Sequence, residues 1–202
     1  MAFAVSRETL DRLVIYADLL QRWQKAVNLV APSTLAEVWH RHFADSAQLA
    51  VLMPPAAARH ADLGSGGGFP GLVLAIMLAE RGQPRSVLIE SDERKCAFLR
   101  EVARHTGIAV EIVTKRIEIA ETRRMVATVD VVTARALAPL ERLFGLCAQI
   151  CTASTLGLFL KGRGVERELA DARRTWRFEY RLVPSMTQEG AFVVQVRQLS
   201  PV

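Results

Sequence analysis

The residues best suited to bind a ligand lie between Asp62 and Gly71, where the chain reads DLGSGGGFPG. A glycine-rich turn directly after a strand lets the backbone approach a ligand closely, because glycine carries no Cβ. Asp62, Gly64, Gly66 and Gly68 have the spacing Asp-x-Gly-x-Gly-x-Gly. This spacing is typical of loops that wrap S-adenosylmethionine, so it indicates a methyltransferase.

Other kinds of glycine loop have different spacings. A phosphate-binding P-loop has the pattern GxxxxGK[ST], and no lysine follows these glycines. In the dinucleotide pattern GxGxxG, the sixth residue counted from Gly64 is Phe69, but counted from Gly66 it is Gly71. The segment therefore argues against a P-loop and leaves open a nicotinamide or flavin enzyme, or a purely structural turn.

An acidic residue, Glu90, ends the next apolar segment of the chain. At the end of the second strand of such a fold, a carboxylate can accept hydrogen bonds from the ribose hydroxyls of an adenosine. NAD and S-adenosylmethionine share this ribose, so Glu90 indicates adenosine without separating the two. A solvated carboxylate at a strand end is the alternative.

From about residue 58 onward, short apolar segments alternate with amphipathic ones. This alternation predicts an α/β fold, in which right-handed βαβ units form a mostly parallel sheet with helices on both faces. The glycine loop and Glu90 then follow strands at the carboxyl edge of the sheet, where such folds bind ligands. The predicted strands are 59–63, 86–90, 110–113, 129–133 and 155–160, and the predicted helices are 70–81, 92–106, 117–124, 139–151 and 165–176.

The end of the chain departs from this alternation. Segments 177–183 and 191–198 follow each other without a helix between them. Two strands joined in this way form an antiparallel hairpin. We therefore predict a seven-stranded sheet that contains one antiparallel strand.

The first part of the chain, residues 1–55, is predicted to be a helical extension packed on a catalytic domain of residues 56–202. Ser6 is placed to cap a first helix, and a second helical stretch runs from Pro32 towards Met53. The apolar positions of the first helix follow a helical period and are Leu10, Leu13, Val14, Ala17, Leu20, Trp23 and Val27.

The charge of the chain is modest support for a polyanionic partner such as nucleic acid. The net charge of the 202 residues is +5, and a positive surface attracts phosphates. Lysine occurs only at positions 25, 95, 115 and 161, so the other basic residues are arginine. Arginine binds phosphates and base edges in a planar, bidentate geometry, although a codon bias for arginine explains its abundance equally well.

Metal and membrane binding are not expected. The cysteines at 96, 147 and 151 form no CxxC pair, and no Cys/His cluster has zinc spacing, so we expect reduced, structural thiols and no metal. The apolar run 72–79 is far shorter than the roughly 18 residues of a membrane span, and no secretory signal pattern is visible. We expect a cytoplasmic protein without a membrane partner, and a monomer by default.

Nearly the whole chain resembles one bacterial family, the methyltransferases that modify the N7 of a guanine in 16S ribosomal RNA, also called glucose-inhibited division protein B. Gln24 and Val30 depart from the family pattern, which often has Asn and Thr there, but neither lies in the glycine loop. The resemblance rests on Trp23, Asn28-Leu29, RHFADS at 41–46, GSGGGFPG at 64–71, LIESDERK at 88–95, TARALAPL at 133–140 and FLKG at 159–162.

The resemblance implies a Rossmann-like class I methyltransferase fold, S-adenosylmethionine as cofactor, and 16S ribosomal RNA or the small ribosomal subunit as partner. Ile117 would offer an apolar wall and Glu118 an acid to the adenine, and Arg135 would lie at the methionine end. Packing under the loop is the alternative for Phe69, and an exposed helix position is the alternative for Glu118. The expected cofactor contacts are Gly64, Gly66, Gly68, Phe69, Glu90, Ile117, Glu118 and Arg135.

Guanine N7 carries a lone pair and no proton, so its methylation needs no general base and can proceed by alignment and exclusion of water. The base must be unstacked, and because N7 must stay free, recognition should use O6 and the N1/N2 edge. Arg116, Arg135 and Lys161 are predicted to act at the catalytic site, and Arg163 is a further candidate for RNA contact. His42 and Asp45 are placed either near the active site or in helix packing.

Further arginines could extend a track for phosphates, but a solvated face is the favoured interpretation of the charges on 165–176, where acidic residues are interspersed. The track arginines are 123, 124, 173, 174 and 177, and the acidic residues are Glu166, Glu168 and Asp171.

Three alternative functions remain open. They are a methyltransferase for another acceptor, a nicotinamide-dependent oxidoreductase, and an RNA-binding domain that kept the fold without catalysis.

Overall fold

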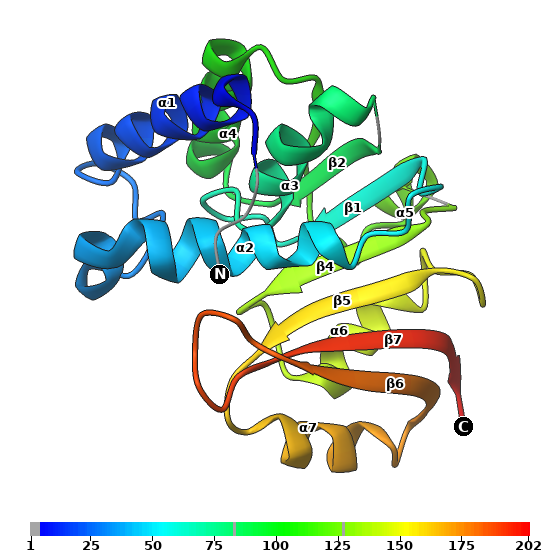
Figure 1. The fold of residues 1–202 in the computed structure, drawn as a ribbon. Helices are drawn as coiled ribbons and strands as arrows, with labels where there is room; N and C mark the ends of the chain where they lie inside the picture. Colours follow the sequence, from blue (N-terminus) through cyan, green and yellow to red (C-terminus); the bar gives the residue numbers. More distant parts are fainter. Residues whose placement is uncertain (1–4, 83, 127) are drawn as a thin grey trace.

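In residues 5–82, 84–126 and 128–202, which the computed structural model describes, seven strands form one sheet (Figure 1). Their order is β3-β2-β1-β4-β5-β7-β6, and neighbouring strands are parallel except in the pairs that involve β7. The predicted α/β sheet with an antiparallel strand from the terminal hairpin is confirmed. The strands are β1 Arg59–Leu63, β2 Arg85–Glu90, β3 Val110–Thr114, β4 Val131–Arg135, β5 Leu156–Lys161, β6 Trp176–Pro184 and β7 Phe192–Pro201.

Helices cover both faces of this sheet (Figure 1). One face packs against α1, α3, α4 and the N-terminal segment (residues 5–53), and the other packs against α5, α6 and α7. The α-helices are α1 Arg7–Trp23, α2 Asp45–Ala47, α3 Gly71–Leu78, α4 Glu93–Thr106, α5 Ala120–Val126, α6 Leu140–Cys147 and α7 Val165–Ala172.

Strand β1, which carries the glycine loop at its end, forms although it is poor in β-branched residues. It pairs on both sides, so that Asp62 lies opposite Leu88 of β2 and Thr133 of β4. Its last four residues are buried. Pairing and burial outweigh a weak local preference for strand, and the prediction of this strand is confirmed.

Helix α1 begins where it was predicted, and Leu13, Ala17 and Leu20 of its predicted apolar face are buried. Ser6 Oγ accepts the Thr9 backbone N–H at 3.0 Å. Leu10 and Val14, predicted to be inside, are 46% and 43% exposed, whereas Tyr16 is fully buried. Apolar residues occur around most of this helix, and packing among aromatic rings selects the side that carries Tyr16.

The stretch from Pro32 towards Met53 is helical, as predicted, but it is not one regular helix. A 3-10 turn, η1 (Pro32–Glu37), is followed by a π-helical turn, η2 (Trp39–Ala44), and by α2. A last 3-10 turn, η3 (Gln48–Val51), ends the stretch before Pro54. Elsewhere, α6 ends four residues earlier than the predicted helix 139–151.

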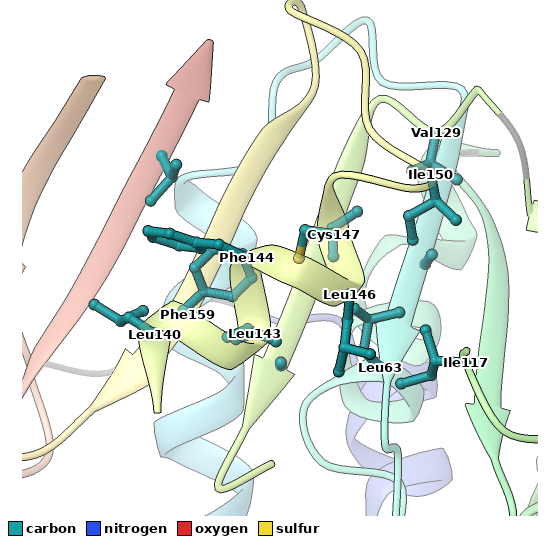
Figure 2. Close-up of a cluster of buried hydrophobic side chains, with 14 of the residues drawn as sticks. Leu63, Ile117, Val129, Leu140, Leu143, Phe144, Leu146, Cys147, Ile150 and Phe159 are labelled. Carbon is teal, nitrogen blue, oxygen red and sulfur yellow. The ribbon is translucent and has the colours of Figure 1, made fainter. Parts of the chain in front are cut away.

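The face covered by α5, α6 and α7 is densely packed with apolar side chains (Figure 2). Leu140, Leu143 and Phe144 of α6 point towards the sheet, where Phe144 and Phe159 lie with ring centroids 6.0 Å apart. Both rings are at most 1% exposed. This cluster anchors the strands whose ends carry the site.

Two further expectations concern the cysteines and membrane-spanning helices. Cys96, Cys147 and Cys151 are free thiols, as expected. None of the helices in the described part of the chain is long and apolar enough to cross a membrane.

Candidate active site

The glycine loop leaves β1 at the carboxyl edge of the sheet and turns into α3. Gly64 and Gly66 have φ angles of 64° and 56°, a left-handed conformation that glycine adopts without side-chain strain. The Ser65 backbone N–H donates to the Ile89 carbonyl oxygen at 3.0 Å, and Ser65 Oγ donates to the Asp62 carbonyl oxygen at 3.1 Å. The loop is thus tied to the ends of both β1 and β2.

Glu90 closes the loop from the end of β2. Its Oε2 accepts the Gly66 N–H at 2.9 Å, and its Oε1 accepts the N–H groups of Ser91 at 2.7 Å and Asp92 at 2.9 Å. A carboxylate has about four acceptor positions, so Glu90 can accept a further hydrogen bond. Its position agrees with the predicted contact to a ribose, which stays a prediction.

Tyr16 of α1 supports the loop from the opposite side. Its hydroxyl donates to the Gly67 carbonyl oxygen, and burial raises the pKa of Tyr16 well above its usual value, so the group stays a donor. Gly68 has a φ of 93°, and a Cβ there would collide with the Tyr16 hydroxyl. The structure therefore places Gly68 against α1, on the side of the loop that faces away from the cavity described next.

A cavity of about 670 Å³ opens between the glycine loop and the ends of β2, β3 and β4. Ile117 is buried in its wall and Glu118 is exposed beside it. An apolar surface next to an acid is the arrangement predicted for an adenine. The predicted site residues that line this cavity are Gly64, Gly66, Phe69, Glu90, Arg116, Ile117, Glu118 and Arg135.

Arg135 is the last residue of β4, where the sequence placed it just after the strand. Its Nη2 donates to His42 Nδ1 at 2.8 Å and its Nη1 donates to the Arg41 carbonyl oxygen at 3.1 Å. Nη1 also lies 3.6 Å from Asp45 Oδ2. The guanidinium carbon stands 5.1 Å from the centroid of the Phe69 ring, within the range of a cation–π contact. The RHFADS motif therefore orients Arg135.

The protonation of His42 follows from its partners. Because arginine only donates hydrogen bonds, Nδ1 must accept, and a neutral ring then carries its proton on Nε2. Nε2 lies 2.7 Å from Thr34 Oγ1, which donates to the Ala31 carbonyl oxygen at 2.7 Å. Burial, together with the charges of Arg135 and Arg41, lowers the pKa of His42 to about 4. One directed chain of hydrogen bonds thus runs from Arg135 to the backbone of the N-terminal segment.

Asp45 connects Arg135 to the loop between β6 and β7. Its Oδ1 accepts hydrogen bonds from Thr187 Oγ1 at 2.7 Å and from Gln48 Nε2 at 2.8 Å. Gln48 Oε1 in turn accepts the Met186 N–H at 2.9 Å. These contacts hold the hairpin loop at the rim of the cavity, which Thr187 also lines.

A second chain of polar side chains crosses the sheet beneath the glycine loop. Thr133 Oγ1 donates to Asp62 Oδ1 at 2.6 Å. His60 Nε2 lies 2.8 Å from Thr133 Oγ1, and His60 Nδ1 lies 3.1 Å from Ser86 Oγ. All four residues are at most 1% exposed. Burial lowers the pKa of His60 to about 4 and raises the pKa of Asp62 to about 6, against the opposing effect of the Thr133 hydrogen bond.

A second cavity, of about 450 Å³, adjoins the first at the ends of β4 and β5. The two cavities share residues 135–138, Asp45 and Gln188. Lys161, the last residue of β5, lines the second cavity and is absent from the wall of the first. Its Nζ donates to the Ala138 carbonyl oxygen at 2.6 Å and to Glu168 Oε2 at 2.7 Å.

The prediction that Glu168 belongs to a solvated face is wrong. Its side chain is 29% exposed, and its Oε2 accepts the Leu140 backbone N–H at 2.8 Å in addition to the bond from Lys161. Glu168 lies one turn after the buried Val165, so it occupies the border of the packed face of α7. Glu166, in contrast, is exposed.

Three of the arginines that could extend a phosphate track lie away from the site, and Arg173 and Arg174 are exposed, as the solvated-face interpretation predicts. Residues 173, 174 and 177 lie at the opposite edge of the sheet from the site, because Trp176 pairs with Pro201 at the far end of β7. Arg173 stands over the ring of Tyr180 with its guanidinium carbon 5.0 Å from the centroid. Arg163 lies at the carboxyl edge beside Gly190.

Sequence reasoning missed several residues that support the site, above all Tyr16, Thr34, Thr187 and Glu168. The RHFADS motif pointed to His42, but no local pattern pairs it with Thr34. For Tyr16 a weak signal was available, because a buried tyrosine hydroxyl needs a hydrogen-bond partner. The partners lie too far away in the sequence to be read from it.

Comparison with protein families decides among the functions left open by the motifs. The profile of the family described as rRNA small subunit methyltransferase G matches residues 9–194. The chain belongs to this family. The match spans the N-terminal segment, the glycine loop and most of the terminal hairpin, and it confirms the resemblance read from the motifs.

Relatives with the name ribosomal RNA small subunit methyltransferase G are similar over most of their length. One from Parvibaculum lavamentivorans is 53% identical over 195 residues, covering 96% of this chain and 85% of its own. One from Paramagnetospirillum magneticum is 52% identical over 198 residues, covering 97% of this chain and 92% of its own.

Solved structures of other methyltransferases share the fold. An O-methyltransferase from Bacillus cereus in complex with SAH has a TM-score of 0.60 at 14% identity, covering 91% of this chain and 90% of that one. The SAH-bound methyltransferase PaMTH1 from Podospora anserina has a TM-score of 0.59 at 14% identity, covering 98% of both chains. The predicted Rossmann-like methyltransferase fold is confirmed.

Proposed function

We propose that this protein transfers a methyl group from S-adenosylmethionine to the N7 of a guanine in the 16S ribosomal RNA of the small ribosomal subunit. The observation that carries this proposal is the family match over residues 9–194. The glycine loop and Glu90 at one cavity support the cofactor, and the resemblance described above supports the guanine.

The residues around the first cavity fit S-adenosylmethionine. Its volume of about 670 Å³ falls in the range of roughly 300–1,000 Å³ that is usual for small-molecule sites. Residues 64–67 line the cavity, and three of them are glycines, so that Ser65 is the only one of the four with a Cβ. The backbone of this loop can therefore approach a ligand closely. Gly64 has a φ of 64°, which strains any residue with a Cβ, and a Cβ there would come within 2.6 Å of Leu137 Cδ1 and displace that side chain.

We assign roles to these residues by their positions. Glu90 holds the ribose, Ile117 and Glu118 face the adenine, and Arg135 over Phe69 lies at the methionine end. Gly64 and Gly66 supply backbone that approaches the ligand, while Gly68 keeps the loop closed against Tyr16 and acts indirectly. Arg116 lines the same cavity and is exposed, so it is the candidate for contact with RNA.

The bound cofactor supplies a methyl group on a sulfonium, which is electrophilic enough to react with a neutral nitrogen. The residues of this chain then have to orient two reactants and exclude water, which can lower the barrier by several kcal/mol, about 7–11 in favourable cases. The hydrogen-bond chain through His42 fixes Arg135 in one orientation. No proton has to be removed from N7, and with a pKa of about 4 His42 is neutral and serves orientation.

Ribosomal RNA is the proposed partner. We also propose that residues 1–55 support the catalytic part, residues 56–202, through Tyr16 and the RHFADS motif. Within the described ranges of the chain, no cluster of His, Cys, Asp or Glu is arranged to hold a metal ion.

Transfer of labelled methyl groups from S-adenosylmethionine tests the proposal. The acceptors are small ribosomal subunits, and RNA extracted from them, isolated from cells that lack the modification. We expect one guanine to become labelled and to show the chemical lability of an N7-methylated base. Label that appears in protein or in a small molecule, with none in RNA, would contradict the proposal.

A further inference from the structure

The second cavity contains a charged pair that the cofactor site does not use. Lys161 and Glu168 both line it, with side chains that are 10% and 29% exposed. We propose that this pair reads the O6, N1 and N2 edge of the acceptor guanine, so that Glu168 is a specificity-determining residue. This inference rests on the proposed function and identifies the site of its acceptor.

The pair has unused hydrogen-bonding capacity. An ammonium carries three protons, and Lys161 Nζ uses two of them, towards the Ala138 carbonyl oxygen and Glu168 Oε2. Glu168 Oε2 accepts from Lys161 and from the Leu140 N–H, whereas Oε1 accepts a hydrogen bond from no residue within 5–82, 84–126 and 128–202. The pair therefore keeps one donor and one acceptor free, on two residues that line the cavity.

This donor and acceptor match guanine and oppose adenine. Along its edge, guanine presents the O6 acceptor and then the N1–H and N2–H donors, while adenine presents the N6 donor and then the N1 lone pair. The Lys161 ammonium can donate to O6, and Glu168 Oε1 can accept from N1–H and N2–H. With adenine the ammonium would face an amino group and the carboxylate would face a lone pair.

The positions of the two cavities agree with the geometry of the base. N7 and the N1/N2 edge lie on different sides of a purine, so the group that reads the base has to lie away from the methyl donor. The second cavity shares residues 135–138 with the first. A base that enters the second cavity can therefore point N7 across this wall towards the first.

The pair is also held in place before any base arrives. Glu168 is fixed by the backbone at the start of α6, and Lys161 is fixed by the Ala138 carbonyl oxygen, both at hydrogen-bond distances below 3 Å. Side chains that are already ordered lose little entropy when a ligand binds. This favours a recognition role over that of a mobile phosphate contact.

The test combines a variant of the enzyme with a variant of the base. Glu168→Gln keeps the size of the side chain and an oxygen for the Leu140 N–H, but it replaces a carboxylate oxygen with an amino donor. After the methylated guanine has been mapped, RNA is prepared with inosine at that position, which lacks only the N2 amino group. Initial rates give kcat/KM for both enzymes on both RNAs, and Glu166→Gln, on the exposed side of α7, is the matched control.

We expect wild-type kcat/KM to fall about tenfold when inosine replaces guanosine, in line with the loss of one good base contact. Glu168→Gln should be about tenfold slower than wild type on guanosine and should lose little more on inosine, because the contact is already gone. Glu166→Gln should behave like wild type. Binding of S-adenosylhomocysteine, measured by calorimetry, should be the same for all three proteins and reports on the fold.

Two results overturn this inference while leaving the proposed function intact. One is a wild-type enzyme that methylates inosine RNA as fast as guanosine RNA, a result that does not depend on any variant. The other is a Glu168→Gln enzyme with wild-type rates or with the full inosine penalty. A wild-type enzyme that methylates neither these RNAs nor small subunits assembled from them overturns the proposed function, and the inference falls with it.

Discussion

On one face of the central sheet, under α5, α6 and α7, buried aromatic and aliphatic side chains such as Phe144 and Phe159 fill the space (Figure 2). On the other face, at equal depth, the same strands bury His60, Asp62 and Thr133 in a chain of hydrogen bonds. Residues of a strand point alternately to the two faces. Neighbouring positions of β1 therefore serve two different purposes.

Apolar packing and polar hydrogen-bond chains contribute differently: the first stabilises the fold, and the second orients side chains. The burial of apolar surface lowers the free energy of the folded state in proportion to area and without regard to direction. Buried polar chains add little net stability, about 0.5–1.5 kcal/mol for each hydrogen bond, but they are directional and costly to break. We expect changes in the apolar cluster under α6 to act mainly on unfolding, and changes in the polar chains around the site to act mainly on its geometry.

The largest expected effect is on the apolar face. Phe144→Ala should lower the free energy of unfolding by about 3–5 kcal/mol, because it removes a fully buried ring and leaves a cavity. Urea denaturation followed by circular dichroism measures this loss. Leu10→Ala, on the exposed side of α1, is the control and should change stability by less than about 0.5 kcal/mol. A Phe144→Ala protein as stable as wild type would contradict this account of the core.

Arg135→Ala should reduce methyl transfer about 100-fold. The substitution removes the guanidinium that we place at the methionine end of the first cavity, and it leaves Asp45 without its ion-pair partner Arg135. A 100-fold change corresponds to about 2.7 kcal/mol of barrier. Arg177→Ala, at the far edge of the sheet, is the matched control and should transfer at the wild-type rate. Equal activity of the two variants would remove Arg135 from the site.

Asp45→Asn should reduce methyl transfer about tenfold, a smaller loss, because the amide oxygen can still accept from Thr187 while the charge beside Arg135 disappears. Thr187→Val keeps the charge and removes the bond to the hairpin loop, so it separates the two contacts. If neither variant affects transfer while both bind S-adenosylhomocysteine normally, Asp45 has no positioning role.

The smallest expected effect is on the pH dependence of stability. With its pKa raised from 3.8 to about 6, Asp62 binds more protons in the folded state, so its contribution to stability falls as pH rises through this interval. His60, with its pKa lowered from 6.5 to about 4, has the opposite effect, and stability rises with pH. The two slopes oppose each other in the wild type.

In Asp62→Asn the opposing slope of Asp62 is lost, while the rising contributions of His60 and His42 remain. Between about pH 4.5 and pH 6.5 the free energy of unfolding should therefore rise by about 2 kcal/mol more than in the wild type. Urea denaturation at several pH values measures the slope, which does not depend on the absolute loss caused by the substitution. Parallel pH profiles for the two proteins would show that Asp62 does not titrate as inferred.

Much of the fold could be predicted because its signals are local. Apolar segments placed β2 to β7 to within a few residues, and the glycines after β1 marked both that strand and the ligand-binding edge. The docking face of α1 could be predicted only in part, because Leu13, Ala17 and Leu20 are buried as predicted but Leu10 and Val14 are exposed. Its apolar residues are spread around the helix, and only the aromatic rings of other elements select the side that carries Tyr16.

Some residues of the site could likewise be predicted from the sequence and others could not. Glu90 could be recognised because a strand end next to a glycine loop is a place for a ribose contact. Glu168 could not, because a glutamate on a short charged helix has the same local pattern whether it faces water or a lysine. Its partner Lys161 is seven residues away, but Leu140 is 28 residues away.

By itself, the sequence determined the order of strands and helices, the glycine loop and the family, since these depend on residue types and spacings within short segments. Only the tertiary structure decided which groups hold the site together. Arg135 meets His42 across 93 positions, Thr133 meets Asp62 across 71 and Thr187 meets Asp45 across 142. Such hydrogen bonds need atoms within about 3 Å in a defined direction, and that condition is met only when the packed sheet has brought distant segments into register. The glycine loop marks where the ligand binds, and the fold supplies the neighbours that shape the site around it.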